Sequence, residues 1–237
     1  MGVYFCTMQK DSLIVIPDLH GNSIWKEIVS RKNYRKVVFL GDYFDSRNFK
    51  IGIDDELNNF TEILKFRDEH PDKVVLLCGN HDLHYLSGIF SMSSGYQPEH
   101  SEKINTILQP LYDLHILKMS HYDDQTETMF SHAGISRLWF ESLFGSEEYK
   151  PQDIVTLINN GFWKHPQIFE YQQIDDDLEG NGESEKEGPC WIRPFSLLQH
   201  PLTLIQVVGH TQQKEVTKIG NIYFTDTLNS GKGTMEL

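Results

Sequence analysis

The sequence has only three cysteines in 237 residues, and they lie far apart at Cys6, Cys78 and Cys190. An odd number of widely spaced cysteines does not make a disulfide framework, so reduced thiols and a cytoplasmic location are expected. Cys78 ends an apolar run, which indicates a small core residue and not a reactive thiol.

Long apolar runs are also missing. No segment approaches the roughly 20 apolar residues that a membrane-spanning helix needs. The first 11 residues are too short and too polar for the apolar core of a signal peptide. The hydrophobic and charged fractions, 39% and 23%, are those of an ordinary globular protein. We therefore expect one α/β domain over residues 1–237 and no membrane partner.

Positive charge is scarce, because 21 Lys and Arg stand against 34 Asp and Glu and give a formal net charge of −13. Surfaces that bind nucleic acid are normally basic, so a nucleic-acid partner is not expected. A phosphorylated substrate is still compatible, since bound divalent cations dominate the local field. Much of the acidic excess lies in 175–187, which is predicted to be a solvated loop, with a flap over a site as the alternative.

Three polar runs each follow a short apolar segment. Residues 18–22 (DLHGN) follow 13–16, residues 41–45 (GDYFD) follow 37–40, and residues 79–82 (GNHD) follow 74–77. Continuous apolar runs are typical of buried parallel strands, and the segments between them have helical spacing. A β-α-β-α-β succession puts all three polar runs at the carboxyl edge of one sheet, where ligands bind.

The rest of the chain is less regular. Helices are predicted at 101–113, 136–144 and 151–160, the last ending before Gly161. Strands are predicted at 115–120 and 126–132, joined by a turn at 122–125, and again at 203–208 and 221–226. Two histidine runs, 131–134 (SHAG) and 209–211 (GHT), follow strands in this half.

Side chains at these strand ends can hold two divalent cations. The first cation is expected to be bound by Asp18, His20 and Asp42, and the second by Asp42, Asn80, His132 and His210. Mixed oxygen and nitrogen donors suit manganese, iron or zinc better than calcium, and Mn²⁺ is the metal we expect. Two such ions can bind a phosphate ester and make the water that bridges them a nucleophile.

His81 follows Asn80 directly but is needed by neither cation, so we predict that it protonates the leaving oxygen of the ester. A cationic imidazole needs a nearby carboxylate, and Asp45 is the expected partner. The residues expected to contact the phosphate are Arg193, Arg47 and Asn80. His84 is predicted to be an ordinary helix-surface histidine, with a supporting position behind His81 as the alternative.

As an ordered set, these motifs resemble those of the calcineurin-like metallophosphoesterases. The pattern is Gly-Asp-x-His-Gly, Gly-Asp-x-x-Asp and Gly-Asn-His-(Asp/Glu), followed by separate histidines, and it spans residues 18–226. The bacterial and bacteriophage branch of Ser/Thr phosphoprotein phosphatases is the most similar. The resemblance implies an α/β sandwich of two mixed β-sheets flanked by α-helices, with the active site at the C-terminal ends of the strands. It also implies the same six ligands and a catalytic pair of His81 and Asp45.

The chain departs from that pattern at several positions. Arg47 stands one residue later than the family's arginine, and Asp82 replaces the glutamate that is commoner in protein phosphatases. The last motif has a single histidine, as in this branch, with Gln212 where other branches have a second one. The segment around Arg193 is similar to the one that carries a phosphate-binding arginine in bacterial members.

We therefore predict a phosphomonoesterase of the Ser/Thr protein phosphatase type that acts on a phosphoprotein or a small phosphoester. One alternative is a hydrolase resembling the symmetrical bis(5'-nucleosyl)-tetraphosphatases. The other is a non-catalytic scaffold with the same fold, although such a protein would be expected to lack some ligands. The irregular segments 90–98 and 162–189 are where substrate specificity is expected to lie.

Overall fold

The computed structural model describes residues 12–31, 33–146, 148–171, 184–228 and 235–237. The N-terminal segment with Cys6 and most of the predicted acidic loop, 175–183, lie outside the described residues. Across the part that is described, no helix is both long and apolar enough to cross a membrane.

Sheet A contains the three predicted buried strands and has the order β10-β1-β2-β3-β4. Its strands are β1 (Ser12–Ile16), β2 (Tyr34–Phe39), β3 (Val74–Leu77), β4 (Leu117–Lys118) and β10 (Met235–Glu236). β1, β2, β3 and β4 pair in parallel, as the sequence predicts for the first three, and β10 runs antiparallel to β1.

Sheet B has the order β5-β6-β7-β9-β8 and is mixed. Its strands are β5 (Ser120–Asp123), β6 (Thr128–Ser131), β7 (Ile205–Val208), β8 (Thr217–Ile219) and β9 (Ile222–Phe224). β6, β7 and β9 are parallel, whereas β5 and β8 are antiparallel edge strands.

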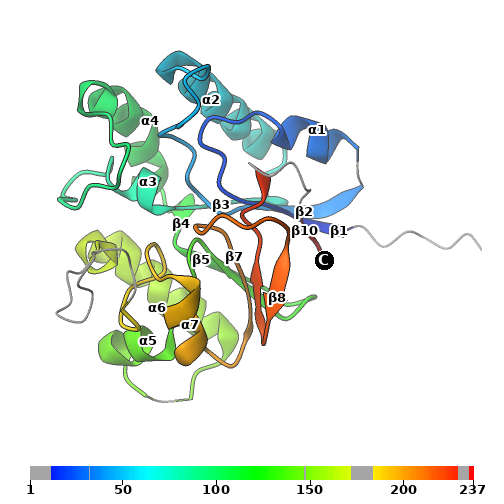
Figure 1. Ribbon diagram of the computed structural model, residues 1–237, viewed down its shortest axis with the longest axis vertical. Helices are drawn as coiled ribbons and strands as arrows, with labels where there is room; N and C mark the ends of the chain where they lie inside the picture. Colours follow the sequence, from blue (N-terminus) through cyan, green and yellow to red (C-terminus); the bar gives the residue numbers. More distant parts are fainter. Residues whose placement is uncertain (1–11, 32, 147, 172–183, 229–234) are drawn as a thin grey trace, which may run out of the picture.

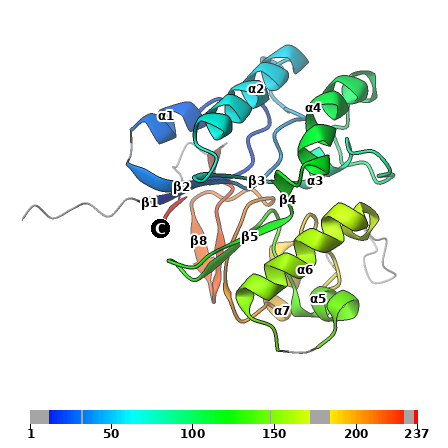
Figure 2. The same cartoon turned by 180° about the vertical axis from the view of Figure 1, so that it is seen from behind.

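The two sheets form the centre of a layered α/β sandwich, with helices on the outer side of each (Figures 1 and 2). Beside sheet A are α1 (Trp25–Ser30), α2 (Ile53–Glu69), α3 (Asn80–Leu83) and α4 (Ser101–Asp113), with the short 3₁₀ turn η1 (Pro98–His100) before α4. Beside sheet B are α5 (Arg137–Phe144), α6 (Pro151–Lys164) and α7 (Pro194–Gln199), with η2 (Pro166–Phe169) after α6. The predicted fold class is thus confirmed.

Alternate residues of β1 belong to two different hydrophobic clusters. Leu13 and Val15 pack in the cluster that also contains Phe130 and Val207 of sheet B, so this face of β1 lies toward the other sheet. Ile14 and Ile16 belong to the larger cluster that includes the helices. Burial on both faces explains why the first strands are continuously apolar.

One predicted strand is in fact two. The segment 115–120 divides at Met119 into β4 of sheet A and β5 of sheet B, so the chain passes from one sheet to the other there. The backbone N–H groups of Met119 and Ser120 both donate to Asn159 Oδ1, at 2.9 and 3.1 Å. This buried side chain supplies the hydrogen bonds that a continuous strand would have made. The turn after β5 consequently falls at 124–127 and not at 122–125.

Helix α6 is longer than its sequence predicts, because it continues through Gly161 to Lys164. A Cβ at Gly161 would lie 3.3 Å from Ile168 and 3.4 Å from Phe144, so the glycine allows close packing and does not end the helix. The next residue, Phe162, is fully buried, and its burial favours the additional turn.

Candidate metal centre

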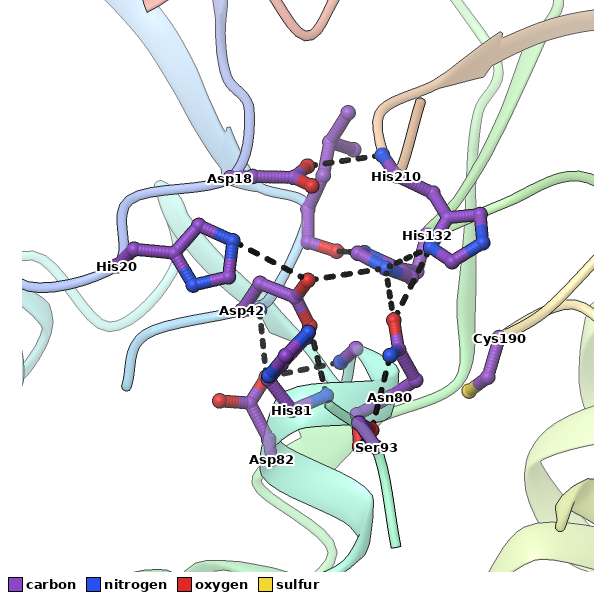
Figure 3. Close-up of polar contacts among 12 residues, drawn as sticks. Asp18, His20, Asp42, Asn80, His81, Asp82, Ser93, His132, Cys190 and His210 are labelled. Carbon is purple, nitrogen blue, oxygen red and sulfur yellow. Dashed lines mark hydrogen bonds and ion pairs between the residues drawn. The ribbon is translucent and has the colours of Figure 1, made fainter. Parts of the chain in front are cut away.

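The predicted ligands converge from both sheets on one pocket. Asp18, His20, Asp42 and Asn80 follow strands of sheet A, and His132 and His210 follow β6 and β7 of sheet B (Figure 3). The pocket encloses about 830 Å³, and all of these except His132 line it. His132 is fully buried beneath it.

Each of the three predicted histidine ligands has one ring nitrogen against a backbone carbonyl. The pairs are His20 Nδ1 with Phe44 O at 2.7 Å, His132 Nδ1 with Leu40 O at 3.0 Å, and His210 Nε2 with Trp191 O at 3.1 Å. Because a carbonyl only accepts, these nitrogens carry the protons. The opposite nitrogens therefore face the pocket with their lone pairs when the rings are neutral, which is the state that binds a metal.

Three acceptors meet at the sheet B side of the centre. His132 Nε2 lies 3.0 Å from Asn80 Oδ1 and 3.1 Å from His210 Nδ1, and His210 Nδ1 lies 3.0 Å from Asn80 Oδ1. Asn80 Nδ2 donates to Ser93 Oγ at 3.0 Å, which turns the amide oxygen toward the imidazoles. Burial first, and then the neighbouring His132, lower the pKa of His210, so the ring is neutral. Acceptors this close repel unless a cation lies among them, so the donor set fits a divalent metal.

Asp42 lies between the two groups of imidazoles. Its Oδ2 is 3.7 Å from His20 Nε2 and 3.4 Å from His132 Nε2. Ligating atoms of Asp42, His132 and His210 lie within 4.8 Å of one another, and so do those of His20, Asp42 and His81. Although burial opposes it, the charges of His132 and His81 lower the pKa of Asp42. A carboxylate in this place is able to bridge two cations.

Asp82, the departure from the usual glutamate, organises the loops of the centre. Its Oδ2 accepts the backbone N–H groups of Asp42 and Gly79 at 2.7 and 2.8 Å, and its Oδ1 accepts that of Tyr43 at 2.8 Å. Asp18 has a similar backbone contact, since His210 N–H donates to its Oδ1 at 2.9 Å. The shorter acidic side chain therefore still connects the ends of β2 and β3.

His81 and Asp45 form the predicted pair. His81 Nδ1 lies 2.9 Å from Asp45 Oδ2, and the ring lines the pocket beside His20. Burial disfavours the cationic ring, but the charge of Asp42 and the hydrogen bond to Asp45 outweigh it and raise the pKa of His81. This environment suits a general acid.

The preferred prediction for His84, a helix-surface histidine, is wrong. The residue is buried, and its Nε2 lies 2.8 Å from Asp45 Oδ2. Helix α3 ends at Leu83, so His84 turns inward at its end, where Ser93 N–H donates to its Nδ1 at 3.1 Å. Tyr85 also donates to Asp45, at 2.5 Å to Oδ1. Gln97 Nε2 is a fourth contact, at 3.3 Å from Oδ1. Although burial opposes it, the hydrogen bonds from His81, His84 and Tyr85 lower the pKa of Asp45 to about 2.

Both predicted phosphate-binding arginines line the pocket. Arg193 Nη1 donates to Thr211 Oγ1 at 3.1 Å, next to His210. Arg47 is exposed and donates to Ser94 Oγ at 3.0 Å, so it reaches the pocket despite its shifted position in the motif. Whether either contacts phosphate stays a prediction, as do the assigned ligand and catalytic roles.

Sequence reasoning gave no role to several pocket residues, among them Asp226, Tyr171 and Trp191. Asp226 stands just after β9, at the same kind of strand end that identified Asp18 and Asp42, so its position was an available signal. Tyr171 and Trp191 contact each other edge to face, with ring centroids 5.4 Å apart. No local pattern connects two aromatic residues 20 positions apart.

Comparison with known proteins gives a consistent result. The family model described as calcineurin-like phosphoesterase matches residues 12–214. Among solved structures, a mutant cold-active protein tyrosine phosphatase is similar, with a TM-score of 0.59 and 19% identity over 95% of this chain and 74% of that chain. A protein serine/threonine phosphatase from Saccharomyces cerevisiae has a TM-score of 0.52 and 12% identity over 92% and 68%. No curated protein sequence matches the chain.

Proposed function

The chain belongs to the calcineurin-like phosphoesterase family, and from this premise we propose that it is a dimetal phosphomonoesterase of the Ser/Thr protein phosphatase type. The family assignment supports a metal-dependent phosphoesterase with a phosphorylated substrate. The more specific proposal of a phosphomonoesterase rests on one observation. The proposed metal-binding nitrogens of His132 and His210 and the His81–Asp45 pair converge on one pocket.

In this proposal the metal-binding residues are Asp18, His20, Asp42, Asn80, His132 and His210. Two divalent cations, Mn²⁺ in our proposal, would polarise the phosphate and activate a water. The carbonyl contacts hold the imidazoles in the tautomers whose other ring nitrogen can bind a cation.

The protein's own groups would perform the remaining steps. His81 delivers a proton to the departing oxygen, while Asp45 holds the ring in place through its 2.9 Å contact. Arg193 and Arg47 would bind the phosphate oxygens from the pocket wall. Asn80 is proposed to bind phosphate as well, from its position next to His81.

Large apolar side chains around the pocket support a polypeptide substrate. Phe49, Phe90 and Phe195 are 93%, 80% and 76% exposed, and each lies within two residues of a pocket-lining residue. Met92 lines the pocket and is 66% exposed. Exposed apolar groups of this size usually mark a binding surface. A phosphorylated segment of a protein would cover them, whereas a small phosphoester would not.

The test compares the wild type with His81→Asn on p-nitrophenyl phosphate and Mn²⁺. We expect kcat to fall by about 100-fold to 10,000-fold, because the general acid is lost, while two Mn²⁺ remain bound per chain. The matched control is His115→Asn, since His115 is exposed and has a positive φ of 58° that Asn tolerates. An inactive wild type with both ions bound would refute the proposal.

The dinucleoside-tetraphosphatase alternative is favoured by one observation, the Tyr171–Trp191 pair in the pocket, which offers aromatic faces to a base. Rates on phosphoserine, phosphothreonine and phosphotyrosine peptides should be compared with the rate on diadenosine tetraphosphate. A higher kcat/KM on the dinucleotide than on every peptide would replace our proposal with this one. Binding of clearly less than two ions per chain would instead favour the scaffold.

A further inference from the structure

Asp226 is a buried acidic residue of the pocket to which no role has yet been given. It follows β9, and its backbone is fixed because its carbonyl accepts Gln213 N–H at 2.7 Å. The preceding residue, Thr225, donates its N–H to Val208 O at 2.8 Å. The side chain is only 5% exposed, yet it lines the pocket together with Asp18 and Asp42.

The carboxylate of Asp226 differs from the other buried carboxylates around it. Asp18, Asp42 and Asp45 each accept hydrogen bonds from the protein. Asp226 Oδ1 is buried and has no hydrogen-bond partner among the described residues. A buried carboxylate oxygen without a donor costs free energy, and native proteins rarely keep one without a use.

Asp226 shares the pocket with two other buried carboxylates, those of Asp18 and Asp42. Three carboxylates facing one pocket repel one another in the metal-free protein. A cation held between them removes this repulsion and supplies the partner that Oδ1 lacks.

We infer that Asp226 is a further carboxylate of the metal centre, facing the cation that Asp18, His20 and Asp42 would hold. It increases the affinity of the centre for a divalent cation and is a positioning residue for that ion. This inference rests on the dimetal centre of the proposed function. It adds an acidic residue to the side of the centre with the fewest ligands.

The test is calorimetric titration of Asp226→Asn and the wild type with Mn²⁺ alone. Asparagine keeps the shape and removes the charge, so we expect Mn²⁺ to bind one of the two sites about tenfold more weakly or worse. The melting temperature of the metal-free variant should equal or exceed that of the wild type, because a repulsion has been removed. Asp226→Ser, which also removes the charge, should weaken binding in the same way.

The matched control is Asp123→Asn. Asp123 is equally buried but is paired with Arg35 through two contacts of 2.7 Å and does not line the pocket. This variant should lower the melting temperature and leave the affinity for Mn²⁺ unchanged.

The outcomes separate two failures. If the wild type binds two Mn²⁺ and Asp226→Asn binds both with equal affinity, the role of Asp226 is wrong and the proposed function stands. The same conclusion follows if the metal-free variant melts lower and its Mn²⁺ affinity is unchanged, since that is the behaviour of a structural carboxylate. If the wild type binds no Mn²⁺, the proposed function fails and this inference fails with it.

Discussion

Several residues of the proposed centre have an unusual backbone conformation. His20, Asp42, Asp45 and His210 have φ values of 44°, 54°, 64° and 63°. Left-handed backbone is uncommon outside glycine and costs about 1 kcal/mol or more per residue. At each of these positions the chain leaves a strand or turns sharply. The side chain then points toward the pocket or toward a residue that lines it. Strain of this kind is typical of functional sites.

A residue away from the centre gives a prediction for pH dependence. His121 lies on β5 with its Nε2 3.3 Å from Lys36 Nζ. Burial, followed by the charges of Lys36 and Lys118, lowers the pKa of His121 to about 3. The unfolded chain takes up a proton near pH 6.5, where the folded protein does not, so stability falls as the pH drops below about 6.5.

We therefore expect His121→Gln to lose less stability than the wild type on acidification. When the pH is lowered from 7.5 to 5.5, the unfolding free energy of the wild type should fall by about 1 kcal/mol more than that of the variant. Urea denaturation at the two pH values measures it, and other titrating groups cancel in the comparison. Equal losses in the two proteins would show that His121 is protonated in the folded state.

For single residues, the sequence best predicts the location of those whose place in the fold follows from the motif that contains them. Asp18, Asp42 and His81 stand beside apolar strands, so their convergence follows from parallel pairing. His84 could not be placed in the same way, because its burial depends on where α3 ends and on Ser93, nine residues later. Side chains brought in by irregular loops are specified by tertiary packing and not by local pattern.

Among the elements, the ends of β2 and β3 approach each other unusually closely. A Cβ at Gly79 would lie 2.1 Å from Asp42 Oδ1, and one at Gly41 would lie 2.3 Å from Gly79 N. No side chain fits between these loops. Two adjacent parallel strands can bring their proposed ligands onto one pocket only because both loops begin with glycine.

We expect Gly79→Ala to abolish binding of at least one Mn²⁺ and to lower the unfolding free energy by more than about 2 kcal/mol. Gly52→Ala is the matched control, because both glycines precede a helix with extended backbone and donate to an aspartate three residues later. Its Cβ would meet nothing closer than 3.8 Å, so the cost should stay below about 1 kcal/mol. Titration with Mn²⁺ and urea denaturation test both, and equal effects would contradict the steric argument.

The sequence predicts elements well where one periodicity persists. The helices at 101–113 and 136–144 agree with α4 and α5, whose N-cap Ser136 accepts Trp139 N–H. The division at Met119 was not predictable, because the side chain that satisfies the break, Asn159, is 40 residues away. The two-residue strand β10 is too short to show an alternating pattern.

For the whole molecule, the metal centre is expected to act as a link between the sheets. Ligands on the sheet A side are joined to His132 and His210 on the sheet B side through Asp42 and Asn80. A ligand that binds only the folded state adds about 2.7 kcal/mol at a concentration of 100 times its Kd. Saturation with Mn²⁺ should therefore raise the melting temperature of chelator-treated protein by about 5 to 10 °C.

His210→Gln is the variant for this measurement, since it removes one imidazole from the sheet B side. In this variant, the increase in melting temperature on adding Mn²⁺ should be less than about half of the wild-type increase. Differential scanning fluorimetry, with EDTA and then with excess Mn²⁺, gives both numbers. An identical rise in both proteins would mean that His210 binds no metal.

The distribution of the proposed ligands over both layers has a practical consequence. Asp18 lies near one end of the described chain and His210 near the other, 192 positions later, yet their contact at 2.9 Å belongs to a single pocket. Turnover therefore requires that both halves of the polypeptide have assembled against each other. A simple colorimetric assay would then report complete assembly, and a fragment carrying either half alone should be catalytically silent however well it is structured.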